Sequence, residues 1–168
     1  RPPACYRPPR RQSPASQVAQ RIQVCGPIVS PRAACATGLW AIAQGVELIR
    51  TDQCDVVVAG AADAPITPLT LAGFERMGAL AHDGAYPFDQ KCSGFVLGEG
   101  VGLMILERRD HAEARGARPY GQVLGFGLTC DADHISAPKP DRSGAITAIQ
   151  DCLQRSRLSP RQVDFIHA

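Results

Sequence analysis

Residues 39–50 carry the pattern that most constrains how this chain can fold. Their apolar side chains recur every three or four positions, a spacing that places them on one buried face of a helix (Leu39, Ile42, Ala43 and Val46). The following run, residues 54–59, is continuous, apolar and β-branched, which predicts a strand buried on both faces. A short apolar run at residues 28–29 precedes the helix. Strand, helix and strand in this order predict an α/β fold with a parallel or mixed sheet.

Cys35 stands at or just before the first turn of this helix. The unpaired N–H groups and the positive dipole end of a helix N-terminus favour the thiolate form of a cysteine placed there. The small neighbours Ala34, Ala36 and Gly38 leave room for a substrate to approach. Cys35 is therefore a candidate nucleophile. The alternative is a small core residue, because buried cysteines are common.

The rest of the chain continues the alternation of helices and strands. Helices are expected over residues 16–24, within 65–80, and over 107–116 and 143–155, and strands over 103–106, 120–128 and 163–167. The glycine-rich run at 98–102 lacks the Lys-Ser/Thr pair of a phosphate-binding loop and precedes a strand. Its glycines are therefore expected to let backbone pass close to backbone.

Composition excludes several classes of function. The 168 residues suggest one domain or a piece of one, and a net charge of +2 without a basic stripe argues against a nucleic-acid partner. No apolar run has the length of a membrane span. The seven cysteines and four histidines lack metal-ligand spacing, so we expect no metal site, reduced thiols and a cytoplasmic protein. Residues 1–14, rich in proline and arginine, are expected to be disordered.

Separated motifs then occur in one order along the chain. Ala-Cys-Ala-Thr-Gly (34–38) is followed by Asp-Val-Val-Val-Ala-Gly-Ala (55–61), Pro-Phe-Asp (87–89) and Gly-Phe-Val-Leu-Gly-Glu-Gly-Val-Gly (94–102). This order resembles the beta-ketoacyl-acyl-carrier-protein synthases, the condensing enzymes of fatty-acid and polyketide synthesis. The resemblance runs from about residue 16 to residue 168 and leaves residues 1–14 outside the family region.

The resemblance implies an incomplete thiolase-like fold. Family members duplicate an architecture of α/β/α/β/α layers and are more than twice this length. Residues 15–117 would be the rear of the first half, and residues 118–168 the front of the second. The family's His-Gly-Thr run would begin just after Ala168, so His167 is not expected to be the catalytic histidine.

The resemblance also implies a condensation reaction. Cys35 would be the nucleophile that takes an acyl group from acyl carrier protein, and its backbone N–H would be one oxyanion donor. Malonyl-carrier would then lose carbon dioxide, and its carbanion would attack the acyl-cysteine. Substrates would be attached to the phosphopantetheine of the carrier, with no further cofactor. An intact protein would form a homodimer, whereas this chain, without the family's two histidines, is expected to be inactive.

Six further residues map onto the family's site. Phe74 and Met77 would line the acyl pocket and set chain length, although plain core packing is the alternative reading. Ser136 would contact the phosphopantetheine arm. Gly98, Glu99 and Gly100 would be structural residues close to the site.

Two other functions stay open beside fatty-acid synthesis. One is a polyketide-type ketosynthase, although Ala-Cys-Ala-Thr-Gly and the 107–116 helix are more similar to the stand-alone fatty-acid type. The other is a degenerate, non-catalytic partner like the chain-length factors, which keep the fold without the active cysteine. The presence of Cys35 argues against that second role.

Overall fold

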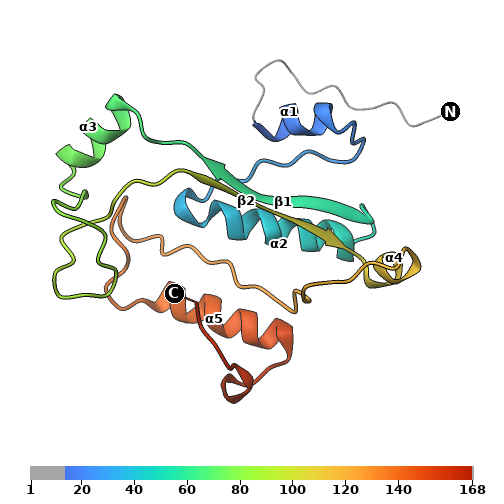
Figure 1. Cartoon of the computed structure of the whole chain (residues 1–168). Helices are drawn as coiled ribbons and strands as arrows, with labels where there is room; N and C mark the ends of the chain where they lie inside the picture. The colour runs from blue at the N-terminus through green and yellow to red at the C-terminus, as the bar shows by residue number, and fades with distance from the viewer. Residues whose placement is uncertain (1–13, 168) are drawn as a thin grey trace. The chain divides into compact units, whose positions relative to one another are not determined.

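The computed structural model describes residues 14–167, and Figure 1 shows their helices and strands. The elements are, in chain order, α1 (Pro14–Arg21), η1 (Ala34–Ala36), α2 (Thr37–Arg50), β1 (Val56–Asp63), α3 (Pro68–Arg76), β2 (Gly100–Glu107), α4 (Arg109–Ala114), α5 (Ser143–Ser156) and η2 (Pro160–Gln162). They form two compact units. Within the described residues, 14–42 and 58–106 make the first, and 43–57 and 107–167 make the second.

Strands β1 and β2 form a two-stranded sheet, and Figure 1 shows them running in opposite directions. Beyond the end of β2, the N–H of Arg108 donates to the carbonyl of Asp55 at 3.2 Å. Within the sheet, Gly60 has a φ of +151°, and a Cβ there would collide with the carbonyl oxygen of Gly102. Glycine at position 60 is therefore what allows the two backbones to approach so closely.

The predicted helix after Cys35 is confirmed as α2. Ala43 and Val46 of its apolar face are buried, as expected from their spacing. In its first turn, a Cβ added at Gly38 would stand only 3.4 Å from the Ala61 side chain of β1, so this turn packs closely on the strand. Leu39, expected to be buried, is 72% exposed, because no described side chain packs over that face of the first turn.

The other predicted helices are also present. α3, α4 and α5 fall within or close to the expected ranges, and α1 begins two residues before its predicted start. Thr67 caps α3 by accepting the N–H of Thr70 at 3.2 Å, with Pro68 at the first helical position. Local spacing and capping signals were sufficient for these elements.

The strand predictions were less accurate. β1 begins at Val56 and ends at Asp63, and of its eight residues only Ala59 is buried. The prediction of burial on both faces was wrong because, within residues 14–167, β1 pairs with β2 alone and most of its surface is left uncovered. No strand forms at 28–29, 120–128 or 163–167 in the described chain. A strand needs a hydrogen-bonded neighbour, and these segments find none there.

The segment predicted as a strand over 120–128 instead packs against helices of its own unit. A Cβ at Gly125 would stand 2.9 Å from the Cys152 carbonyl of α5, and one at Gly127 would collide with Ala148 of the same helix. The guanidinium of Arg155 lies 4.7 Å from the centre of the Phe126 ring. Arg50, at the end of α2, donates to the carbonyl of Leu124 at 3.0 Å. Helix contacts therefore take the place of strand pairing here.

Candidate active site

Cys35 is the middle residue of η1 and lies two residues before α2 begins. The preceding residue, Ala34, has a φ of +45°, a left-handed conformation that a residue with a Cβ seldom adopts. The Thr37 hydroxyl stabilises it by donating to the Ala34 carbonyl at 2.7 Å and accepting the Ala33 N–H at 3.0 Å. The Ala36 N–H closes the turn on the Ala33 carbonyl at 2.9 Å. The chain thus makes a braced, strained turn at the candidate nucleophile.

The Cys35 thiol is exposed and free. A thiol that serves only to fill the core would be covered, so exposure favours the nucleophile over the core alternative. As an early residue of the helical turn, Cys35 also carries a backbone N–H at an end where helices offer no internal acceptor. Its roles as nucleophile and oxyanion donor stay predictions.

Glu99 is exposed, and its Oε1 accepts the N–H of Ile66 at 3.1 Å. This bond ties the start of β2 to the loop between β1 and α3. No described atom lies within 4 Å of a Cβ added at Gly98 or Gly100, so close backbone packing does not explain these two glycines. The expected close approach does occur in this run, at Gly102, whose carbonyl lies against Gly60; sequence reasoning did not single out Gly60 for it.

Phe74 projects from α3 and meets the ring of Phe95 edge to face, with centroids 5.0 Å apart and planes at 84°. The backbone of Phe95 is held in turn, because its N–H donates to Ala79 at 3.0 Å and its carbonyl accepts from Ala81 at 2.9 Å. Met77, just past the end of α3, is 65% exposed. The structure therefore pairs Phe74 with Phe95, a partner that sequence reasoning missed, although Phe95 lies in one of the quoted motifs.

Ser136 belongs to the other unit and lies in an exposed loop between residues 129 and 142. Its N–H donates to Nδ1 of His134 at 3.1 Å. At the base of the loop, Asp131 Oδ2 accepts the Lys139 N–H at 3.0 Å and the Thr129 hydroxyl donates to the Gly144 carbonyl at 2.8 Å. A polar cavity of about 300 Å³ opens beside this base, lined by Thr129, Cys130, Asp131, Lys139, Ser143, Gly144 and Thr147.

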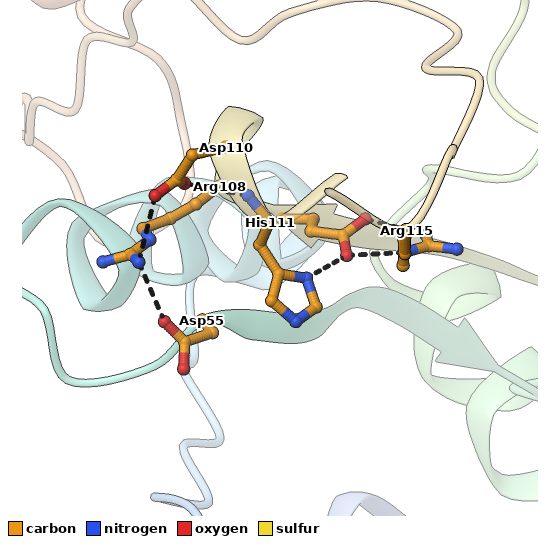
Figure 2. Close-up of polar contacts among 6 residues, drawn as sticks. Asp55, Arg108, Asp110, His111 and Arg115 are labelled. Carbon is orange, nitrogen blue, oxygen red and sulfur yellow. Dashed lines mark hydrogen bonds and ion pairs between the residues drawn. The ribbon is translucent and has the colours of Figure 1, made fainter. Parts of the chain in front are cut away.

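A charged cluster joins β2 and α4 in the second unit. Arg115 donates to both carboxylate oxygens of Glu107 at 2.7 and 2.8 Å, and His111 Nδ1 lies 2.5 Å from one of them. The Arg115 guanidinium and, secondarily, His111 lower the pKa of Glu107 from its usual 4.5 to about 2. Figure 2 shows Arg108 reaching Asp55 and Asp110 nearby. These contacts hold α4 against the end of β2, which is a structural role.

The remaining expectations concern metals, thiols and membranes. Within residues 14–167, no group of three or more histidine, cysteine or acidic side chains is placed to hold a metal ion. Cys54, Cys92, Cys130 and Cys152 are free like Cys35. Cys25, however, is disulfide-bonded, contrary to the expectation of reduced thiols. No helix of the described chain is both long and apolar enough for a membrane span. The prediction for residues 1–14 lies outside the described residues except for Pro14, which begins α1.

Known proteins resemble this chain in both sequence and structure. A 3-oxoacyl-[acyl-carrier-protein] synthase 2 from Rhizobium meliloti is 39% identical over 178 residues, covering 95% of this chain and 42% of the relative. The enzyme of the same name from Synechocystis is 43% identical over 141 residues, covering 80% of this chain and 34% of the relative. The chain thus spans less than half the length of these relatives.

Two solved structures resemble it equally well. One, of a type II polyketide acyl-carrier protein in complex with its ketosynthase, has a TM-score of 0.83 and 32% identity over 89% of this chain and 38% of the other. A beta-ketoacyl synthase from Burkholderia phymatum has a TM-score of 0.83 and 29% identity over 92% of this chain and 40% of the other. These ketosynthases are thiolase-like, which confirms the predicted fold class as an incomplete thiolase fold.

Family models match both parts of the chain. Residues 8–112 match the N-terminal domain of beta-ketoacyl synthases, and residues 120–168 match the C-terminal domain. The finer boundaries predicted above, 15–117 and 118–168, stay a prediction. The motif order, the fold and both domain matches agree, and the chain belongs to the beta-ketoacyl synthase family.

Proposed function

We propose that the protein is a 3-oxoacyl-[acyl-carrier-protein] synthase in which Cys35 carries the growing acyl chain. The observation that supports this most strongly is the exposed, free thiol of Cys35 in a strained turn at the start of α2. The small residues on either side of it and the Thr37 brace fix the backbone without covering the sulfur. A nucleophile of acyl transfer needs this combination of a fixed backbone and open access.

In the first step, Cys35 Sγ attacks the carbonyl carbon of an acyl-carrier thioester. The new S–C bond forms first and gives a tetrahedral intermediate, the C–S bond to the carrier then breaks, and the carrier leaves as a thiol with the proton that the Cys35 thiol gave up. Negative charge on the carbonyl oxygen develops between these two events, and the N–H of Cys35 is one donor that can stabilise it. The product is an acyl-cysteine on the enzyme.

In the second step, malonyl-carrier loses carbon dioxide, and the electron pair of the broken C–C bond becomes a carbanion. The carbanion attacks the acyl-cysteine, a new C–C bond forms, and the Cys35 sulfur leaves. The family resemblance assigns decarboxylation to two histidines beyond residue 168. These histidines carry the second step, whereas the first step depends on Cys35 and its oxyanion donors.

The pathway and partners belong to the same proposal. The relatives named 3-oxoacyl-[acyl-carrier-protein] synthase favour fatty-acid synthesis, and the polyketide ketosynthase structure supports the alternative. A carrier protein would deliver substrates on phosphopantetheine, with Ser136 contacting the arm and no further cofactor. A homodimer and a cytoplasmic location also stay predictions. The exposed Cys35 argues against a non-catalytic partner.

Phe74 would set the length of the acyl chain. The edge-to-face contact with Phe95 fixes the Phe74 ring, so the ring can limit the length of the proposed acyl pocket. Phe74→Ala is expected to shift acylation toward longer acyl groups, measured as the ratio of C12 to C6 acyl transfer. Met77→Ala is the matched comparison, since Met77 is largely exposed and should shift the ratio less. An unchanged ratio in Phe74→Ala would mean that Phe74 serves only in packing.

The proposal is tested by intact-mass spectrometry after mixing the protein with an octanoyl-carrier thioester. We expect a mass increase of one octanoyl group in the unmodified protein and none in Cys35→Ala. Adding malonyl-carrier then tests the second step, in which a protein that contains the two histidines should release the octanoyl group from Cys35 as a β-ketoacyl product. An adduct that persists in Cys35→Ala would overturn the assignment of the nucleophile.

A further inference from the structure

His134 is an exposed loop histidine to which the sequence assigns only ordinary turn chemistry, yet two backbone groups converge on it. Its Nδ1 accepts the N–H of Ser136 at 3.1 Å and the N–H of Ala137 at 2.9 Å. A ring nitrogen can accept only when it carries no proton, so these bonds require the tautomer with its hydrogen on Nε2. The histidine is therefore used here as a fixed hydrogen-bond acceptor.

The rest of the loop leaves little else to orient Ser136. Two hydrogen bonds hold the base of the loop. The Asp131 side chain accepts the Lys139 N–H at 3.0 Å, and the Lys139 carbonyl accepts the Arg142 N–H at 3.0 Å. Pro138 and Pro140 restrict φ on either side of Lys139. Between residues 131 and 139, the described backbone adopts neither helix nor strand. The His134 ring thus supplies the bonds that fix the Ser136 backbone within the loop.

We propose that His134 is a positioning residue that orients Ser136 toward the phosphopantetheine arm of the acyl donor. The inference rests on the proposed function, because Ser136 meets the arm only if the protein accepts carrier-bound thioesters. His134 touches neither the thioester nor Cys35 in this account. It acts by holding the backbone N–H of Ser136, and thereby the direction in which the Ser136 hydroxyl is presented.

A comparison of two acyl donors separates this role from a general effect on folding. Octanoyl-phosphopantetheine carries the whole arm, whereas octanoyl-N-acetylcysteamine carries the same acyl group on a short stub. In His134→Ala, acylation of Cys35 by the first donor should fall about tenfold, the order expected when two neutral hydrogen bonds are lost. Acylation by the second donor should stay within about twofold, because the stub lacks the part of the arm that Ser136 is proposed to contact.

A conservative variant provides the rescue. The side-chain oxygen of asparagine accepts backbone N–H groups two or three residues further along the chain. His134→Asn should therefore recover most of the rate with the full-arm donor, and His134→Leu should not. Equal losses with both donors, or an asparagine variant no better than alanine, would overturn the proposal.

Two readouts keep failure of this inference distinct from failure of the proposed function. If iodoacetamide alkylates Cys35 but neither donor acylates it, the proposed function fails and the inference falls with it. If both donors acylate Cys35 and His134→Ala changes neither rate, only the inference fails. Nitrogen-15 NMR of the wild-type histidine ring tests the geometry separately: the backbone N–H groups of Ser136 and Ala137 should show hydrogen-bond coupling to Nδ1, and a hydrogen on Nδ1 would overturn it.

Discussion

Cys35 and Ser136, the two predicted contacts of the acyl donor, are held by different kinds of structure. Cys35 lies in a helical turn that is closed by backbone bonds and one threonine hydroxyl, and the helix after it packs on β1. Ser136 lies in an irregular loop, where side-chain acceptors from His134 and Asp131 bind the backbone. The first position depends on the sheet beneath it, and the second depends on a few individual side chains.

This difference indicates which changes in the structure should displace Cys35 and which should displace Ser136. Damage to the β1–β2 sheet should displace Cys35 while leaving the bonds within the Ser136 loop intact, since those bonds are formed within the loop itself. Removal of one loop acceptor should alter Ser136 without changing the global free energy of unfolding by much, because exposed hydrogen bonds contribute little. Of the three variants below, the first two test how Cys35 depends on the structure around it and the third should leave both positions unchanged; they follow in order of decreasing effect.

Gly60→Ala should have the largest effect. A Cβ at position 60 would collide with the Gly102 carbonyl, and φ at this residue is +151°. Overpacking of this kind lowers the free energy of unfolding by about 1–3 kcal/mol, to which backbone strain adds. Urea denaturation should report the loss, and the rate at which Cys35 is alkylated should change with it.

Gly102→Ala is the matched control on the opposite strand. No described atom lies within 4 Å of a Cβ placed there, so its free energy of unfolding should stay close to that of the wild type. If both variants were equally stable, the close approach at Gly60 would not stabilise the β1–β2 sheet, and the position of Cys35 would not depend on it.

Thr37→Val should have an intermediate effect. Valine keeps the shape of threonine but removes the hydroxyl that bonds Ala33 and Ala34. By analogy with the loss of helix caps, we expect a decrease of about 1 kcal/mol in the free energy of unfolding. Acylation of Cys35 should also slow, whereas Thr37→Ser should retain both properties. Normal acylation in Thr37→Val would show that the brace is dispensable for the nucleophile.

Glu107→Gln should have the smallest effect on Cys35, because Glu107 contacts neither Cys35 nor Ser136 and both should keep their positions. The pKa of Glu107 is lowered from 4.5 to about 2, so its ion pair with Arg115 stabilises the fold above pH 4.5. That contribution is lost as the pH falls from about 4.5 through 2. As the pH is lowered across this range, the melting temperature should fall less steeply in Glu107→Gln than in the wild type. Parallel curves would show that the Glu107–Arg115 pair does not stabilise the fold.

The sequence was a good guide to local structure and a poor one to long-range pairing. The spacing of apolar residues predicted α2 and α5 because a helix closes its hydrogen bonds within itself. The segment 120–128 was predicted as a strand, but it packs on helices, since strand formation depends on a partner elsewhere in the chain. Cys35 could be singled out because its motif is continuous. His134 and Phe95 gain their importance from side-chain directions that no linear pattern encodes.

We propose that Cys35, rather than the other free cysteines of residues 14–167, is the nucleophile for acyl transfer. Cys92 and Cys130 are also free and exposed, so they are internal controls for thiol access. The most direct measurement is peptide mapping by mass spectrometry after brief exposure to octanoyl-phosphopantetheine. We expect the octanoyl group on the peptide that contains Cys35 and on neither control. Comparable labelling of Cys35, Cys92 and Cys130 would contradict it.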